Sequence, residues 1–280
     1  MGLCPRLDHE CGGYAVTLYN KGLVRGRVLL WAVLLCLLPT GCSETPQAEN
    51  TELLIYCGIT MIRPVSEIAA IVEEEENCKF IITKGGSGNL LKSIRINGVG
   101  DLYLPGSESY IQTCLDEGLV TDTALVGYNK AAIMVQKGNP KQITSDLNNL
   151  ACEEYYVVIG NPNSGSIGRE TQKILQNKGI YEAVQTNARE LTTDSKMLFT
   201  VLKEHKADIV INWFATSTWD DNGDYVDVLS IDETYAKKKR LVLGLLKTSK
   251  YPAIARRFME VASSNRGRAL FAKYGLYDVK

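Results

Sequence analysis

The chain has 280 residues, enough for one large domain or two modest lobes with a sizeable hydrophobic core. Hydrophobic residues make up 45% and charged residues 22%, which excludes a disordered, collagen-like or coiled-coil chain. The formal net charge is -1, so we expect no nucleic-acid binding through a basic surface. The two histidines, His9 and His205, make a histidine-rich metal site or a Ser-His-Asp hydrolase an unfavourable interpretation.

The N-terminal region has the pattern of an export signal. Residues 28–38 form an unbroken apolar run, VLLWAVLLCLL, behind three basic residues. A membrane span needs about 20 apolar residues, so this run is too short to remain as an anchor. The sequence LPTGC that follows resembles the lipobox of bacterial lipoproteins, with Pro39 where that family usually has Leu. We therefore expect residues 1–42 to be a lipoprotein-type signal peptide and Cys42 to carry the lipid; plain cleavage and a retained helix are the alternatives.

Behind a polar tether, apolar runs alternate with helical patterns. Apolar runs typical of strands occupy residues 52–60, 78–83, 101–106, 131–138, 155–160, 207–214 and 241–247. Helical patterns occupy residues 64–76, 86–97, 107–118, 145–151, 168–179, 195–205 and 251–264. This alternation predicts an α/β fold of two doubly wound lobes with mostly parallel strands. We expect residues 43–130 to form the first part of lobe 1, 131–242 lobe 2, and 243–280 the return to lobe 1.

Two loops rich in glycine and serine stand between a strand and a helix, one in each half. The first contains residues 85–88 and the second residues 163–168. Small residues there leave backbone N–H groups uncovered at a helix N-terminus, where the dipole favours negative charge. Both loops can therefore offer donors to an anion from opposite sides, although each alone also fits an ordinary turn and helix cap. Neither has the spacing of a P-loop or of a Gly-x-Ser-x-Gly hydrolase elbow.

The ordered landmarks of the body resemble the molybdate-binding proteins of ABC importers, which have the type II periplasmic binding protein fold. The landmarks are YCGIT, GGSGNLLKSI, GVGDLYLPGS, KAAIMVQKGNP, IGNPNSGSIGRETQKIL, TTDSKMLFTVL, KADIVINW and NRGRALFAKYGL. The resemblance covers nearly all of residues 52–280. It implies two α/β lobes joined by a two-strand hinge, which close on a solute and present it to a membrane permease. It also implies a monomer that is exported to the periplasm or cell surface, performs no reaction and needs no cofactor.

In that family a tetrahedral oxyanion is held by neutral hydroxyls and backbone amides. Carried over position by position, the implied ligand-binding residues are Thr60, Ser87, Ser166, Ile167, Ser195 and Trp213. Trp213 stands where the family has a tyrosine hydroxyl, which leaves the size and identity of the ligand open. Lys84 and Arg169 are further departures, because the family's site is uncharged; the sequence leaves open whether they face the cleft or solvent.

Molybdate or tungstate is the expected ligand, and sulfate, phosphate, a phosphonate or a small organic anion are the alternatives. A site with donors and no acceptor offers nothing to a protonated oxygen, which disfavours hydrogen phosphate. Asp194, next to Ser195, can weaken this rule by accepting a proton. The alternative is that its carboxylate interacts with the dipole of the following helix.

Other function classes are a sensor or adhesin lipoprotein without a transport role, and an exported hydrolase. The hydrolase would need a base for a serine, and His205 is far in sequence from both serine loops. A cation site is not expected, since the spacing of the body's cysteines matches no zinc pattern. Those cysteines, whose disulfide state the sequence leaves open, are Cys57, Cys78, Cys114 and Cys152.

Overall fold

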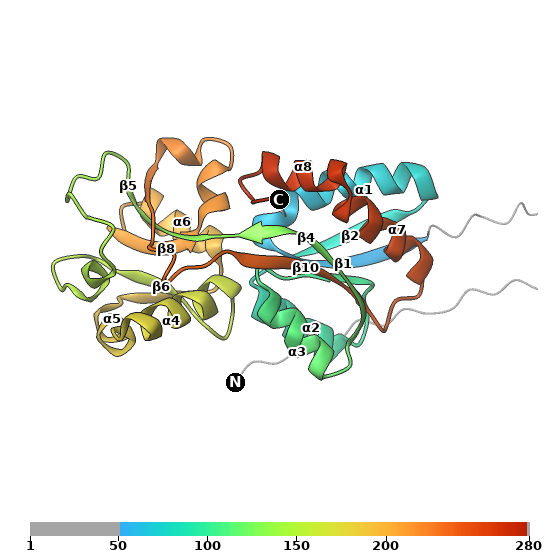
Figure 1. Cartoon of the computed structure of the whole chain (residues 1–280), viewed down its shortest axis with the longest axis horizontal. Coiled ribbons are helices and arrows are strands. Elements are labelled where there is room, and N and C mark those ends of the chain that lie inside the picture. Colours follow the sequence, from blue (N-terminus) through green and yellow to red (C-terminus); the bar gives the residue numbers. More distant parts are fainter. Residues whose placement is uncertain (1–50, 279–280) are drawn as a thin grey trace, which may run out of the picture. The chain divides into compact units, whose positions relative to one another are not determined.

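The computed structural model describes residues 51–278, and these residues form two α/β lobes built on separate sheets (Figure 1). The expected signal peptide, residues 1–42, and the expected lipidation site at Cys42 lie outside the described residues. The described residues belong to one compact unit, so the contacts between the two lobes can be described.

The first lobe has a five-stranded sheet in the order β2-β1-β3-β10-β4. Its strands are β1 (Glu52–Gly58), β2 (Lys79–Gly85), β3 (Leu102–Leu104), β4 (Val120–Asn129) and β10 (Lys239–Leu246). Its helices are η1 (Ile59–Met61), α1 (Ile62–Glu76), α2 (Ser87–Asn97), α3 (Glu108–Asp116), α7 (Pro252–Ser263) and α8 (Asn265–Lys273). Strand β1 is an apolar run that lies between β2 and β3 and is covered on both faces, as is typical of a central parallel strand.

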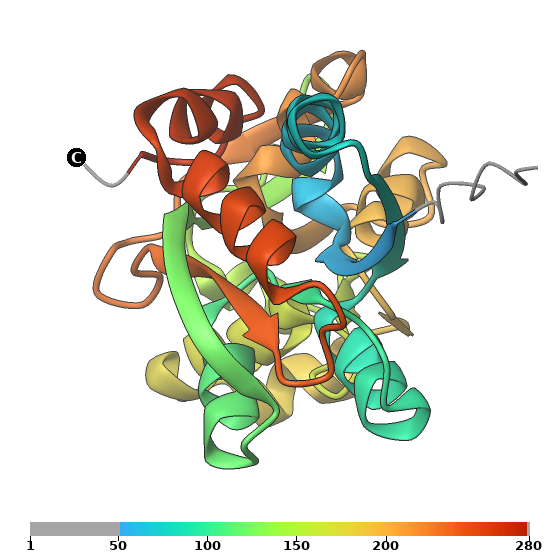
Figure 2. The same cartoon turned by 90° about the vertical axis from the view of Figure 1, so that its right-hand side faces the viewer.

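Helices cover both faces of this sheet. On one face, α1 packs with α7 and α8, so the C-terminal helices lie beside a helix that begins at residue 62 (Figure 2). On the other face, α2 and α3 pack together (Figure 1). Helix α1 shows why: Val65, Ile68, Ala69 and Val72 are buried at the i, i+3, i+4, i+7 spacing of an amphipathic helix. The predicted position of Pro64 in the first turn of this helix is confirmed.

The second lobe has a three-stranded sheet in the order β8-β5-β9 and a parallel pair, β6-β7. Its strands are β5 (Ala131–Gln136), β6 (Val158–Gly160), β7 (Glu190–Thr192), β8 (Ile209–Trp213) and β9 (Val226–Leu229). Its helices are η2 (Leu147–Ala151), α4 (Ser166–Lys178), α5 (Tyr181–Asn187), α6 (Ser195–Lys203), η3 (Phe214–Thr218) and η4 (Asn222–Asp224). Buried side chains from these elements form a core separate from those of the first lobe.

Strands β4 and β10 connect the lobes. They pair antiparallel from Asn129 with Lys239 to Val120 with Leu246, and β5 begins directly after β4 (Figure 1). Because β10 belongs to the first sheet over its whole length, we propose that the first lobe resumes at Lys239. The segment after β8 also contacts the first lobe, since Ala215 of η3 is buried in the core formed by α1, α7 and the sheet.

The predicted α/β architecture is confirmed, but the expectation of mostly parallel strands is wrong. Parallel pairing joins β1 to β2 and β3, and β6 to β7, whereas β10 and β5 pair antiparallel with both of their neighbours. The sequence prediction also missed β4, β7, β9, α5 and α8. Strands β4 and β9 lie at sheet edges, where alternating polar residues such as those of VTDTALVGYN face solvent and hide the apolar signal.

Two properties of residues 51–278 bear on the function. None of their helices combines the length and the apolar character that crossing a membrane requires. No cluster of three or more His, Cys, Asp or Glu side chains there is arranged to hold a metal ion. The four cysteines of this part of the chain are free thiols, and burial raises the pKa of the Cys114 thiol to about 12, so this thiol stays protonated and unreactive.

Candidate functional site

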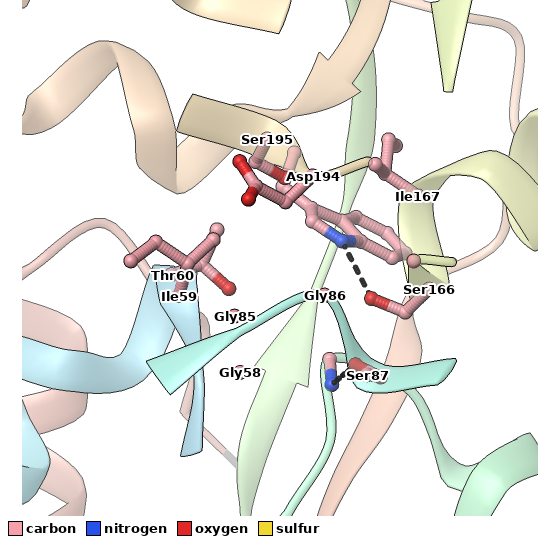
Figure 3. A pocket seen from close by; sticks show the side chains of 13 residues that line it. Gly58, Ile59, Thr60, Gly85, Gly86, Ser87, Ser166, Ile167, Asp194 and Ser195 are labelled. Atoms are coloured by element: carbon pink, nitrogen blue, oxygen red, sulfur yellow. Dashed lines mark hydrogen bonds between the residues drawn. The ribbon is translucent and has the colours of Figure 1, made fainter. Parts of the chain in front are cut away.

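A small cavity lies between the lobes, at the carboxyl ends of β1 and β2 and the N-termini of α2, α4 and α6 (Figure 3). Its volume is about 10 Å³, far below the 300–1,000 Å³ typical of pockets for drug-sized ligands. The residues that line it are Gly58, Ile59, Thr60, Gly85, Gly86, Ser87, Gly106, Gly165, Ser166, Ile167, Asp194, Ser195 and Trp213. All six residues named from the sequence as ligand-binding are in this set. The structure therefore brings together side chains that lie up to 153 positions apart in the chain.

Ser87 is the first residue of α2 and is held by two contacts from the first lobe. Its Oγ accepts a hydrogen bond from the backbone N–H of Gly106 at 3.0 Å. Its carbonyl oxygen accepts the hydroxyl of Tyr103 at 2.7 Å, and complete burial raises the pKa of Tyr103 well above its ordinary value, so this donor stays protonated. Since the Oγ already accepts an N–H, the hydroxyl proton of Ser87 is left for an acceptor in the cavity.

Thr60 lies opposite, in the short helix between β1 and α1. Figure 3 shows Thr60 and Ser87 of the first lobe facing Ser166 and Ser195 of the second across one space. The Thr60 hydroxyl donates to Met61 Sδ at 2.8 Å. A thioether sulfur is a weak acceptor, so this hydroxyl can turn to an oxyanion without losing a strong bond.

Ser166 is the first residue of α4, and its hydroxyl is paired within the second lobe. The indole Nε1–H of Trp213 donates to Ser166 Oγ at 3.1 Å (Figure 3). An indole carries one N–H and no acceptor, so Trp213 does not offer this donor to the cavity in the described arrangement. The backbone N–H groups of the first helical turn, including that of Ile167, have no partner within the helix. Together they give the second lobe a row of donors at this point.

Helix α6 begins at Ser195, and Asp194 is its N-cap. Asp194 Oδ1 accepts the N–H groups of Lys196 at 2.9 Å and Met197 at 3.1 Å, and its carbonyl accepts that of Leu198. Ser195 N–H is the one first-turn donor of α6 that Asp194 does not take, and Ser195 lines the cavity. The carboxylate of Asp194 therefore caps the helix whose dipole the sequence analysis expected it to meet, and it also stands in the cavity wall.

The electrostatics of the site come from dipoles. Three helix N-termini, those of α2, α4 and α6, meet at the cavity, and each carries a partial positive charge. No lysine or arginine is among the described residues that line it, and Asp194 is the one carboxylate in that lining. This combination suits a small anion bound by neutral donors.

The two basic residues singled out from the sequence lie outside the cavity lining. Lys84 is exposed on β2. Arg169 extends from α4 to the first lobe, where its guanidinium carbon lies 3.7 Å from the centroid of the Tyr110 ring and Nη1 contacts Ser109 Oγ at 3.4 Å. Arg169 thus connects the two lobes beside the cavity.

Further contacts show that the cleft is closed. The N–H of Asn89 in α2 donates to the carbonyl oxygen of Ser164 at 3.1 Å, and the Tyr110 hydroxyl reaches the carbonyl oxygen of Pro162 at 3.5 Å. Elsewhere Arg63 of α1 forms an ion pair with Asp220. His205, the histidine of the described residues, follows the end of α6 and does not line the cavity, so the site's serines have no histidine base there.

The sequence prediction missed Gly106, whose N–H donates to Ser87 Oγ, and Tyr103, whose hydroxyl donates to the carbonyl oxygen of Ser87. Both belong to DLYLPGS, a strand followed by a small-residue loop that repeats the pattern of the other site loops. That repeated pattern is the signal that could have identified them.

This chain is similar to known binding proteins in sequence and in fold. A Bacillus subtilis protein named as an ABC transporter substrate-binding lipoprotein is 23% identical, over 89% of this chain and 96% of its own length. The solved structure of the sulfate-binding protein SubI from Mycobacterium tuberculosis superposes with a TM-score of 0.71 at 15% identity, over 82% of this chain and 88% of that one. The periplasmic molybdate-binding protein of Azotobacter vinelandii gives a TM-score of 0.68 at 13% identity, over 81% of this chain and 100% of that one.

At these identities the structural likenesses establish the fold, a two-lobe type II periplasmic binding protein. The family follows from the sequence itself, because the family model for bacterial extracellular solute-binding proteins matches residues 53–277. The chain belongs to the bacterial extracellular solute-binding proteins.

Proposed function

We propose that this protein captures a tetrahedral oxyanion, molybdate or tungstate, between its lobes and delivers it to the permease of an ABC importer. The observation that carries the proposal is the convergence of neutral donors from both lobes on one small closed cavity that no lysine or arginine of the described residues lines. A solute bound there contacts both lobes only when the cleft is closed, so it stabilises the closed state.

Neutral donors are sufficient in energetic terms. A hydrogen bond to a charged group contributes about 1.5–3 kcal/mol net. Roughly five such bonds, from the hydroxyls of Thr60, Ser87 and Ser166 and the N–H groups of Ile167 and Ser195, supply on the order of 8–15 kcal/mol before costs. Micromolar binding needs about 8 kcal/mol. The site therefore needs no formal positive charge.

The partners follow from the family and the relatives. The Bacillus subtilis relative is named as an ABC transporter lipoprotein, and the two solved neighbours are named for molybdate and sulfate. These names support a permease partner and a small oxyanion. The word lipoprotein in the name of the Bacillus subtilis relative supports a lipid anchor on Cys42. We propose that the exported protein acts as a monomer.

Asp194 favours one rival ligand. Its carboxylate in the cavity wall repels a bare dianion but can accept a hydrogen bond from the P–OH group of hydrogen phosphate or of a phosphonate. A protonated oxyanion is therefore the second candidate, with the same fold and the same transport role.

Titration calorimetry of the chain from residue 44 onward with molybdate, tungstate, sulfate and phosphate tests the proposal. We expect micromolar or tighter binding of molybdate and tungstate and weaker binding of phosphate. Tight binding of phosphate without binding of molybdate would mean that the same site takes a different ligand. Absence of binding with all four anions would remove the proposed function.

A further inference from the structure

We propose that Trp213 is a positioning residue of this site: its indole N–H orients the Ser166 hydroxyl as a donor to the solute, and the indole does not itself bind the solute. This inference rests on the proposed function, because it concerns how the same cavity recognises an anion. It also changes the role that the sequence suggested for Trp213, which was direct contact with the ligand.

Trp213 is fixed by the second lobe. It is the last residue of β8 and pairs in register with Ala131 of β5. Its side chain is 1% exposed and belongs to the second lobe's core. The ring therefore has one position, and its N–H has one direction.

That direction leads to Ser166. The N–H lies 3.1 Å from Ser166 Oγ, and the two residues belong to the same lobe, so the bond does not depend on closure. A serine hydroxyl has one proton and two acceptor lone pairs. When the indole N–H occupies one lone pair, the proton turns away from Trp213, toward the cavity that Ser166 lines.

The first lobe has the same arrangement at Ser87. There the donor is the backbone N–H of Gly106, which fills one lone pair of Ser87 Oγ. Gly106 also packs directly against Ser166, because a Cβ at Gly106 would overlap Ser166 Oγ. The two serines therefore meet on either side of Gly106, each with an N–H behind it and its own proton free for the solute.

Asn212, the residue before Trp213, also holds a helix N-terminus at the cavity. Asn212 is fully buried, and its Nδ2 donates to the carbonyl oxygen of Ser195 at 2.9 Å. Neighbouring residues of a strand face opposite sides of the sheet. Asn212 and Trp213 thus hold the starts of α6 and α4, the two second-lobe helices whose N-termini reach the cavity.

The proposal predicts a change in selectivity as well as in affinity. Without the indole N–H, both lone pairs of Ser166 Oγ are open, and the hydroxyl can accept a hydrogen bond from the P–OH group of hydrogen phosphate as readily as it donates one to molybdate. A purely structural role of the ring would weaken binding of all anions equally.

The test compares Trp213→Phe with Trp219→Phe by calorimetry on the purified protein. Phenylalanine keeps an aromatic ring and removes the N–H. Trp219 is the matched control, because its buried Nε1 has no hydrogen-bond partner among the described residues. We expect Trp213→Phe to lower the affinity for molybdate about 2- to 12-fold, as for loss of one hydrogen bond. We also expect it to lower the ratio of the affinity for molybdate to the affinity for phosphate. Trp219→Phe should leave both unchanged.

A double-mutant cycle with Ser166→Ala completes the test. Ser166→Ala should weaken binding less in the Trp213→Phe background than in the wild type. Additive losses, an unchanged selectivity ratio, or an equal effect of Trp219→Phe would overturn the positioning role while the proposed function stands.

If the wild type bound none of the oxyanions, the proposed function would fail. The NMR signal of the Trp213 indole proton would still test whether the indole N–H bonds to Ser166. We expect its NMR signal to shift in Ser166→Ala and to stay in place in Ser87→Ala. A signal that is unmoved by Ser166→Ala would overturn the positioning.

Discussion

Gly86 of the first lobe lies against the carbonyl oxygen of Ser164 in the second lobe. A Cβ at Gly86 would lie 2.5 Å from that oxygen and 2.5 Å from the carbonyl oxygen of Thr193. The backbone of Gly86 has φ −69° and ψ 136°, which any residue adopts. Glycine is therefore needed for the close approach of the second lobe and not for the conformation of the first.

Gly86→Ala should block closure without unfolding either lobe. We expect solute affinity to fall by about 1–3 kcal/mol, or roughly 5- to 150-fold, because the methyl group overpacks a contact that exists only when the cleft is closed. Thermal unfolding without solute should change little. Gly223→Ala is the control, since Gly223 does not line the cavity and its added Cβ would have the carbonyl oxygen of Ser217 as nearest neighbour at 3.6 Å, an ordinary contact. Wild-type affinity in Gly86→Ala would show that closure at this point is unnecessary.

Ser87→Ala should weaken oxyanion binding by about 1.5–3 kcal/mol. The substitution removes a hydroxyl donor and leaves the N–H of Gly106 without its acceptor. Ser93→Ala in the same helix is the control, because Ser93 Oγ bonds to the carbonyl oxygen of Asn89 and does not line the cavity. Calorimetry on both variants checks this prediction. Equal affinities of the two variants would show that the solute does not bind at Ser87.

Asp194→Asn should separate the two ligand classes. Asparagine is as good an N-cap as aspartate, so α6 should keep its start. Removing the negative charge should raise the affinity for a bare dianion such as molybdate, whereas it should lower the affinity for hydrogen phosphate if the carboxylate accepts that proton. Binding constants for both anions across pH 6–8 measure the two directions. An Asp194→Asn variant whose affinity for each anion equals that of the wild type would mean that the carboxylate does not sense the solute.

The stability of the protein should depend on pH through Glu170. Burial raises the pKa of this carboxyl above its ordinary 4.5, and Lys239, whose Nζ lies 3.0 Å from Oε1, opposes the shift. The folded protein therefore holds the proton more tightly than the unfolded chain. As pH rises from about 4.5 through the raised value, the free energy of unfolding should fall, and above that value it should level off.

Urea unfolding of Glu170→Gln between pH 4 and 8 measures this effect. In this variant, the free energy of unfolding should lack the decrease with rising pH that Glu170 causes. Glu67→Gln is the comparison with the opposite sign: hydrogen bonds from Lys273 and Tyr274 lower the pKa of Glu67, so its stabilisation is lost as pH falls. Parallel curves for Glu170→Gln and the wild type would contradict the assignment.

The sequence was sufficient for the features that depend on neighbouring residues. Alternating apolar runs and helical patterns predict an α/β fold, because burial of one helix face or of a central strand requires that spacing. Small residues after a strand predict exposed N–H groups at a helix start, and the loops around Ser87 and Ser166 both line the cavity. The cap at Asp194 has the same local origin, since its partners are two and three residues away.

Only the tertiary structure decided the partners that are distant in sequence. The indole N–H of Trp213 reaches Ser166 from 47 positions away, and the N–H of Gly106 reaches Ser87 from 19. The antiparallel pairing of β4 with β10 joins segments more than 100 residues apart. Such contacts are set by how whole lobes pack, which leaves no local periodicity in the chain. The sequence thus determined which residues could donate hydrogen bonds, and the packing of the lobes determined which acceptors they reach.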